Sequence, residues 1–219
     1  KNTEASKILK NIDSSSNQDT YSLLSLLESY QSGGDYDKHL AICEKLLALD
    51  KEGKLKKDER EIFQGQLQAA GSNLQRKNKP ELVEKYFSML ATYKSKPQGK
   101  LNLLIAETYA KNKKPVKAHE FYNKAFTNFV EDKDAKSMQQ TLDFIFLALA
   151  AKEYKSESKD NDLRAAYDKA ITYFPKSEKT RKIYEKNFRI AIDQNKPEEA
   201  EKVIHTFNNT WPIEKITTE

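Results

Sequence analysis

The stretch Leu101–Phe129, LNLLIAETYAKNKKPVKAHEFYNKAFTNF, decides the fold. It predicts two short amphipathic helices folded back on each other, because small and aromatic residues recur at helical spacing on both sides of one polar turn. Before the turn, Ala106 and Tyr109 lie one helical step apart. After it, residues of the same kind return on one face: Ala118, Tyr122 and Ala125. Pro115 suits the first position of the second helix, since its missing N–H would lack a helical partner there anyway.

The composition favours an all-helical protein with a densely charged surface. Of the 219 residues, 37% are hydrophobic and 32% are charged, while 6 glycines and 6 prolines are fewer than β-rich folds of this length use in their turns. The net charge is +5, and lysine and glutamate are intermixed along the chain. That mixture is typical of a solvated helical surface more than of a phosphate-binding stripe.

Three further features restrict the class of protein. Cys43 is the single cysteine, so we expect a buried, inert thiol and no disulfide within the chain. The longest apolar run, Phe144–Ala151, is shorter than the ~18 residues of a membrane span and predicts a core helix. The chain begins at Lys1 rather than methionine, so we expect that an N-terminal segment has been removed or left out. Localisation stays open between the cytoplasm and, if a signal peptide was removed, the periplasm or the outside of the cell.

The pattern of Leu101–Phe129 recurs along the chain when Tyr109 is taken as an anchor. Small residues lie 3 before the anchor and 9 and 16 after it, and an aromatic residue lies 13 after it. Five units fit this template, some loosely, with these anchors: Tyr30, Leu74, Tyr109, Tyr154 and Ala191. A proline follows three of the anchors by six residues: Pro80, Pro115 and Pro197. In the first unit Gly33–Tyr36 supplies the turn, and in the fourth the polar run Ser156–Asp162 does so.

This arrangement resembles the tetratricopeptide repeat, a helix–turn–helix unit of about 34 residues. The resemblance covers residues 20–212 and implies an all-α fold, a right-handed α-α superhelix of about five repeats. It also implies a concave groove, lined by the first helix of each repeat, that binds a protein or an extended peptide. Residues 1–19 are expected to form an N-terminal cap or the remnant of an upstream repeat, with a helix at Thr3–Ile12. Residues 213–219 are expected to form a tail.

The spacing of the units departs from the family. Successive anchors lie 44, 35, 45 and 37 residues apart, so two repeats carry about 10 extra residues. The extra material, Lys54–Phe63 and Lys133–Asp143, is mostly polar and free of glycine and proline. Ten or eleven residues make about three helical turns. We therefore predict two long first helices, at Lys57–Arg76 and Asp134–Lys155.

No arrangement of residues predicts catalysis, a metal or a cofactor. His39, His119 and His205 fall in different repeats, and packed helices are separated by ~8–10 Å, so these side chains cannot share one metal ion. The lone Gly99-Lys100 pair lacks the glycine cluster of a phosphate loop. Carboxylates gather near the predicted helix starts, where they complement the helix dipole. The sequence therefore predicts a non-catalytic protein with no cofactor.

Groove-facing positions of the family suggest where a partner binds. In the last two units these positions carry basic residues, predicted to form a wall for an acidic protein segment: Lys152, Lys155, Lys182, Lys186 and Arg189. The asparagine that some family members use to clamp a terminal carboxylate is missing. Two alternatives stay open, an RNA-binding helical-repeat protein and an accessory helical domain of a larger enzyme. Nucleic acid is disfavoured because arginine is scarce and tyrosine and phenylalanine fall mostly at core positions.

Overall fold

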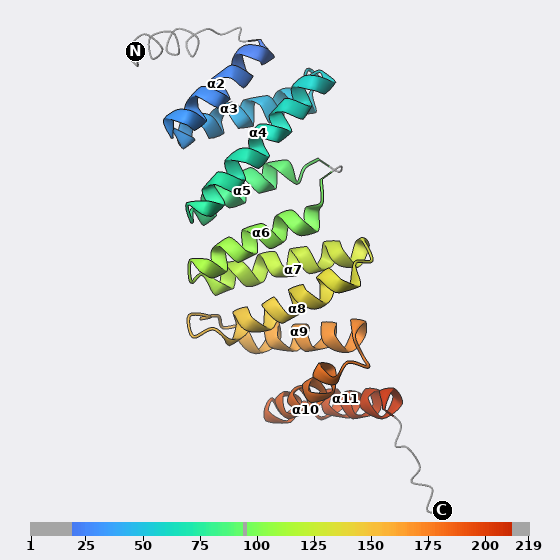
Figure 1. Ribbon diagram of the computed structural model, residues 1–219. Helices are drawn as coiled ribbons and strands as arrows, with labels where there is room; N and C mark the ends of the chain where they lie inside the picture. The colour runs from blue at the N-terminus through green and yellow to red at the C-terminus, as the bar shows by residue number, and fades with distance from the viewer. Residues whose placement is uncertain (1–18, 94–95, 212–219) are drawn as a thin grey trace, which may run out of the picture. The chain divides into compact units, whose positions relative to one another are not determined.

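The computed structural model describes residues 19–93 and 96–211, and these form α-helices joined by short turns (Figure 1). About 80% of the described residues are helical, and none of them lies in a strand. The prediction of an all-α fold built from paired helices is confirmed for the described residues. None of the helices in these two ranges has the length and apolar character needed to cross a bilayer. The predicted helix at Thr3–Ile12 and the tail at 213–219 lie outside the described residues.

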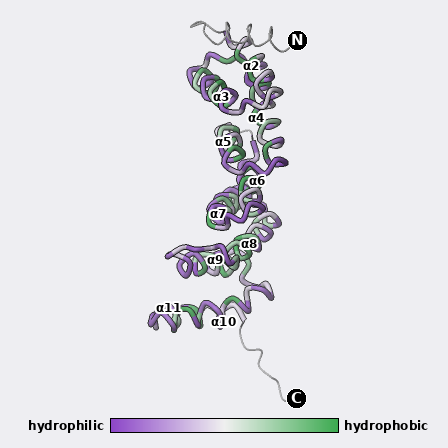
Figure 2. Tube along the Cα trace, turned by 90° about the vertical axis from the view of Figure 1, so that its left-hand side faces the viewer, coloured by the Kyte–Doolittle hydropathy of each residue, from purple (hydrophilic) through white to green (hydrophobic). Residues whose placement is uncertain are grey.

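The chain divides into two compact units, one up to Thr108 and one from Tyr109 onward. The first unit contains α2 (Thr20–Gly33), α3 (Tyr36–Lys51), α4 (Lys57–Arg76), α5 (Pro80–Leu90) and most of α6 (Gln98–Lys111). The second contains α7 (Pro115–Glu131), α8 (Ala135–Ala150), α9 (Lys159–Tyr173), α10 (Glu178–Asp193) and α11 (Pro197–Thr210). Hydropathy alternates along each helix in Figure 2, as expected of helices that bury one face and expose the other.

The turns of three repeats share one backbone geometry. In each, a residue with positive φ follows the first helix: Asn78 (φ 52°), Lys113 (φ 55°) and Asn195 (φ 54°). The N–H of the next lysine then donates to the carbonyl of the anchor residue, from Lys79 to Leu74 (3.1 Å), from Lys114 to Tyr109 (3.0 Å) and from Lys196 to Ala191 (2.9 Å). This bond ends the first helix, and the following proline is the first residue of the second. The three predicted proline turns are confirmed, whereas the turn predicted at Ser156–Asp162 is shorter because α9 begins at Lys159.

Close packing within a hairpin explains the small residue before the anchor. In the α4–α5 hairpin Gly71 and Phe87 are both buried, and a Cβ placed on Gly71 would lie 2.4 Å from Cε1 of Phe87. In the hairpin that follows, the Tyr109 ring stacks on Phe121 with 6.0 Å between centroids. The helices and turn predicted for Leu101–Phe129 are confirmed, since α6 ends at Lys111 and α7 begins at Pro115.

The prediction of two long first helices is half correct. Helix α4 spans Lys57–Arg76, as predicted, but α8 ends at Ala150 and not at Lys155. Ala151 leaves the helix with an extended backbone (φ −65°, ψ 141°), which brings the Tyr154 side chain back into the core, where it is 4% exposed. Burial and hydrogen bonding of Tyr154 therefore oppose further helix. Consequently Lys152 and Lys155 lie on the loop between α8 and α9 instead of on a helix face.

Candidate functional site

A groove of about 530 Å³ lies between α8, α9 and α10 in the second unit. Its floor is made of apolar side chains from all three helices: Leu142, Phe146, Leu149, Leu163, Tyr167 and Ile183. The rings of Phe146 and Tyr167 lie against each other, with centroids 5.6 Å apart. Because lysines surround this floor, we call it the lysine groove.

Helical periodicity produces the floor. On α8, Leu142, Phe146 and Leu149 are spaced four and three residues apart, and Leu163, Tyr167 and Ala170 repeat that spacing on α9. Residues at this spacing share one helical face. The two faces meet beneath the groove, where Leu142, Leu149 and Tyr167 are buried. Phe146, Leu163 and Ile183 are half-buried and keep apolar surface available to a partner.

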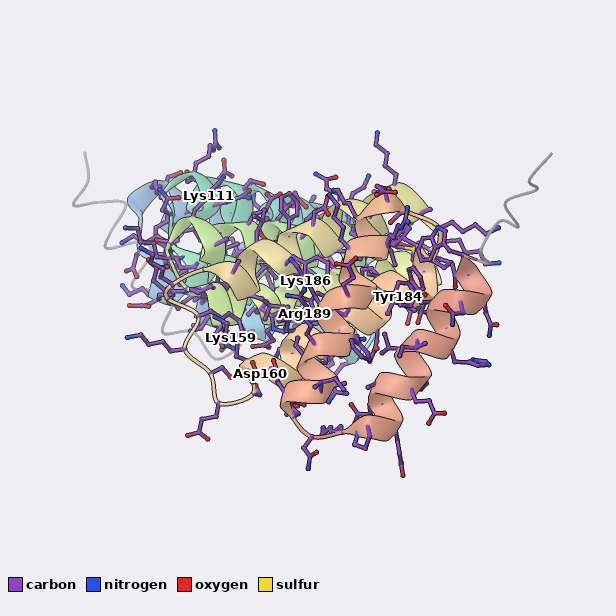
Figure 3. The ribbon with its side chains drawn as sticks, turned by 90° about the horizontal axis from the view of Figure 1, so that it is seen from below. Lys111, Lys159, Asp160, Tyr184, Lys186 and Arg189 are labelled. Carbon is purple, nitrogen blue, oxygen red and sulfur yellow. The ribbon has the colours of Figure 1, made fainter. Side chains whose placement is uncertain are left out.

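The rim carries four lysines, one from the start of α9 and three from α10: Lys159, Lys179, Lys182 and Lys186. Lys179 pairs with Asp143 of α8 at 2.7 Å, which links the two walls. Lys182 and Lys186 are exposed and make no ion pair with any other residue that the structure describes. Figure 3 shows Lys186 and Arg189 on the side of α10 that faces Lys159 and Asp160, whereas Tyr184 lies on the opposite side. The rim therefore offers free positive charge beside an apolar floor.

The structure separates the five predicted binding residues. Lys182 and Lys186 line the lysine groove, and Arg189 is exposed on α10 about one turn beyond Lys186. Lys152 and Lys155 are exposed on the α8–α9 loop and do not line the groove. Their assignment to a helix face was wrong, because α8 ends before them.

The sequence patterns did not indicate two of the rim lysines, Lys159 and Lys179. Lys179 lies three residues before Lys182 on the same helix, a spacing that could have indicated it. Lys159 had no such signal, because its place on the rim depends on where the α8–α9 loop returns the chain.

A buried chain of hydrogen bonds holds that loop in place. The hydroxyl of Tyr154 donates to Asp162 (2.7 Å) and lies 3.1 Å from Nδ1 of His119. Since the hydroxyl proton goes to Asp162, Nδ1 carries the imidazole proton and donates. Nε2 then accepts from the amide of Asn123 (3.0 Å), whose oxygen accepts from Lys169 (2.5 Å). Burial lowers the pKa of His119, which favours this neutral form.

A second histidine is buried in the first unit. Nδ1 of His39 lies 2.7 Å from the Tyr86 hydroxyl and 3.4 Å from the sulfur of Cys43. Burial lowers the pKa of His39 to about 4 and raises that of Cys43 to about 12, so both are neutral at pH 7. His205, in contrast, is exposed on α11. Among the described residues no group of three or more histidine, cysteine or acidic side chains could hold a metal ion.

Comparisons with known proteins add a likeness of fold. No protein-family model matches this sequence, and the search of curated proteins gives no match either. Among solved structures, the chain is similar to a crystal structure from Podosopora anserina described as a kinesin light chain with nearly identical TPR-like repeats. The two are 18% identical, with 87% of this chain and 93% of that one covered, at a TM-score of 0.37. The repeat fold of this chain rests on its own helical hairpins.

Proposed function

We propose that this protein is a non-catalytic interaction scaffold whose lysine groove binds a protein segment with apolar side chains flanked by carboxylates. One observation carries the proposal: exposed Lys182 and Lys186 stand over a floor of half-buried Phe146, Leu163 and Ile183. The apolar floor matches the apolar side chains of the expected partner, and the lysines match its carboxylates.

The apolar floor would supply most of the affinity. Burying a leucine or phenylalanine side chain of a partner is worth about 1.5–3 kcal/mol. The same contact would cover the remaining exposed surface of Phe146 and Leu163. A partner with no apolar side chain would gain neither contribution and would bind weakly.

The lysines would supply selectivity and fast association. An exposed ion pair contributes only about 0.2–1 kcal/mol, but a rim with an excess of positive charge attracts acidic segments and repels basic ones. Lys182 and Lys186 lie four residues apart on α10, so one acidic segment can meet both. The rim contains no arginine, the residue that suits bidentate phosphate recognition. This supports a protein partner over RNA.

Selection from a random peptide library on the 219-residue chain tests the proposal. We expect enriched peptides to contain leucine or an aromatic residue flanked by aspartate or glutamate. A Lys182→Glu/Lys186→Glu variant should bind a selected peptide about tenfold more weakly or worse.

The matched control is Lys51→Glu/Lys57→Glu, which makes the same charge change at exposed positions of the first unit. It should leave peptide affinity within about twofold. Equal loss in both variants, or none in either, would contradict the assignment of the groove. Tight, salt-sensitive binding of single-stranded RNA without peptide binding would support the RNA-binding alternative instead.

A further inference from the structure

A second groove lies on the other side of α10, between α9, α10 and α11, with a volume of about 730 Å³. Polar side chains dominate its lining, the main ones being Asn161, Arg164, Asp168, Asn187, Glu199 and Lys202. We call it the asparagine groove, because Asn187 lies in its floor. Its lining residues all belong to the second unit.

Asn187 is the unusual residue of this floor. It is 4% exposed and lines the groove, and its side chain makes no hydrogen bond with another residue of the described ranges. The hydroxyl of its neighbour in the floor, Tyr184, makes one long hydrogen bond in the described ranges, 3.5 Å to Oγ1 of Thr210. A carboxamide offers two donors and an acceptor. Those of Asn187 are not among the fully enclosed atoms that lack a partner, so they are open to the groove. The groove is therefore the place where Asn187 can find a partner.

The walls of the asparagine groove are balanced in charge. Arg164 of α9 forms an ion pair with Glu199 of α11 and also donates to Gln194 at 2.9 Å. The other charged wall residues, Asp168 and Lys202, are exposed and of opposite sign. A strongly acidic or basic ligand would meet repulsion from one member of each pair. The walls thus favour an uncharged ligand.

The dimensions suit a short extended chain. The α9 wall runs from Asn161 to Thr172, which at 1.5 Å per residue is about 16 Å. A polypeptide in β-like conformation rises about 3.3 Å per residue, so about five residues fit. A peptide group also presents one N–H and one C=O, which a single carboxamide can pair with simultaneously.

We infer that the asparagine groove binds an extended, uncharged polypeptide segment, with the carboxamide of Asn187 paired to one of its backbone peptide groups. The site goes beyond the function proposed for the lysine groove, because it lies on the opposite face of α10 and recognises a different chemistry. Its side chains contact a backbone in preference to particular partner residues, so its sequence selectivity is low.

Nuclear magnetic resonance of the whole chain tests the inference with a blocked pentapeptide of alternating serine and alanine. We expect saturable shifts of the Asn187 side-chain amide and of backbone amides on the facing sides of α9 and α11. Asn187→Ala should weaken binding about tenfold, the effect of losing one or two hydrogen bonds. Asn208→Ala, which removes an exposed asparagine on α11, should leave it unchanged.

Three results would overturn the inference. One is the absence of shifts at Asn187 at millimolar peptide, and another is equal binding by wild type and the Asn187→Ala variant. The third is a response to single-stranded polyuridylate in place of the peptide. Circular dichroism of each variant shows whether it is folded, and Asn187→Leu serves if Asn187→Ala is not. The peptide is uncharged, so failure here leaves the lysine-groove experiment unaffected.

Discussion

One helix, α10, serves two grooves of opposite character. Lys182 and Lys186 point to the lysine groove, and Tyr184 and Asn187 form the floor of the asparagine groove. Two residues advance about 200° around an α-helix, so Lys182 and Tyr184 necessarily lie on opposite faces. The first groove offers apolar surface and positive charge, whereas the second offers hydrogen bonds and balanced charge. We therefore propose that the two grooves bind independently, either two partners or two parts of one partner.

The largest expected effect on peptide affinity comes from a negative charge introduced into the apolar floor of the lysine groove. Leu163→Asp puts a carboxylate among the apolar side chains of the lysine groove, where it loses the burial contribution and repels an acidic peptide. Affinity for the selected peptide should fall about a hundredfold. The control Ala165→Asp changes the asparagine-groove wall on the same helix and should spare that peptide. Fluorescence anisotropy measures both, and similar losses would show that the grooves are not separate sites.

The second largest effect concerns salt, which should weaken peptide binding to the lysine groove more than to the asparagine groove. Raising sodium chloride from about 50 to about 500 mM shortens the screening length, so acidic-peptide binding should weaken about tenfold. Binding of the uncharged peptide should change less than about twofold, because the asparagine groove contributes hydrogen bonds and has paired charges. Titrations at several salt concentrations measure this contrast. Parallel salt dependence of the two peptides would contradict the division between a charged and a neutral groove.

A smaller effect concerns stability. Asn187→Leu removes a buried carboxamide that has no partner among the described residues and adds apolar surface. Without ligand, the variant should be more stable by about 1 kcal/mol, which for a chain of this length raises Tm by about 2–4 °C. Thermal unfolding followed by circular dichroism tests this. A lower Tm would mean that Asn187 makes a structural bond and is no binding group.

Acidification should lower the stability of the fold. The linings of the two grooves contain no histidine, so the difference between a charged and a neutral groove should persist. His39 has a folded-state pKa of about 4 against an ordinary value of 6.5, so the unfolded chain takes up a proton first as the pH falls. Stability from this group is present above about pH 6.5 and is lost progressively toward pH 4. His119 acts in the same direction. Urea unfolding at several pH values should show this fall, and His39→Gln should reduce it.

Local patterns in the sequence predicted the fold because the repeat is local. The anchor, the positive-φ turn and the proline lie within six residues of each other, and the same turn appears after Leu74, Tyr109 and Ala191. The end of α8 could not be predicted in this way. Tyr154 leaves the helix to reach His119, which lies 35 residues earlier in the chain. Only the tertiary structure brings that partner close.

Prediction of the candidate site from the sequence was limited in the same way. Repeat offsets indicated Lys182 and Lys186, which do line a groove, but assigned Lys152 and Lys155 to a helix that ends before them. Asn187 lies three residues after Tyr184 and four before Ala191, a spacing that indicates the buried face of α10, but the sequence does not show whether its carboxamide has a partner. Its burial without a partner depends on how α9, α10 and α11 pack, and that packing is visible only in the structure.

A charge-swap experiment tests whether the lysine groove recognises acidic segments. The affinity of a selected acidic peptide and of the same peptide with lysine at each acidic position would be measured for wild type and for Lys182→Glu/Lys186→Glu. We expect wild type to prefer the acidic peptide and the variant to prefer the lysine-bearing one, each by about tenfold. Loss of both peptides by the variant, or an unchanged preference for the acidic one, would contradict recognition by the lysine groove.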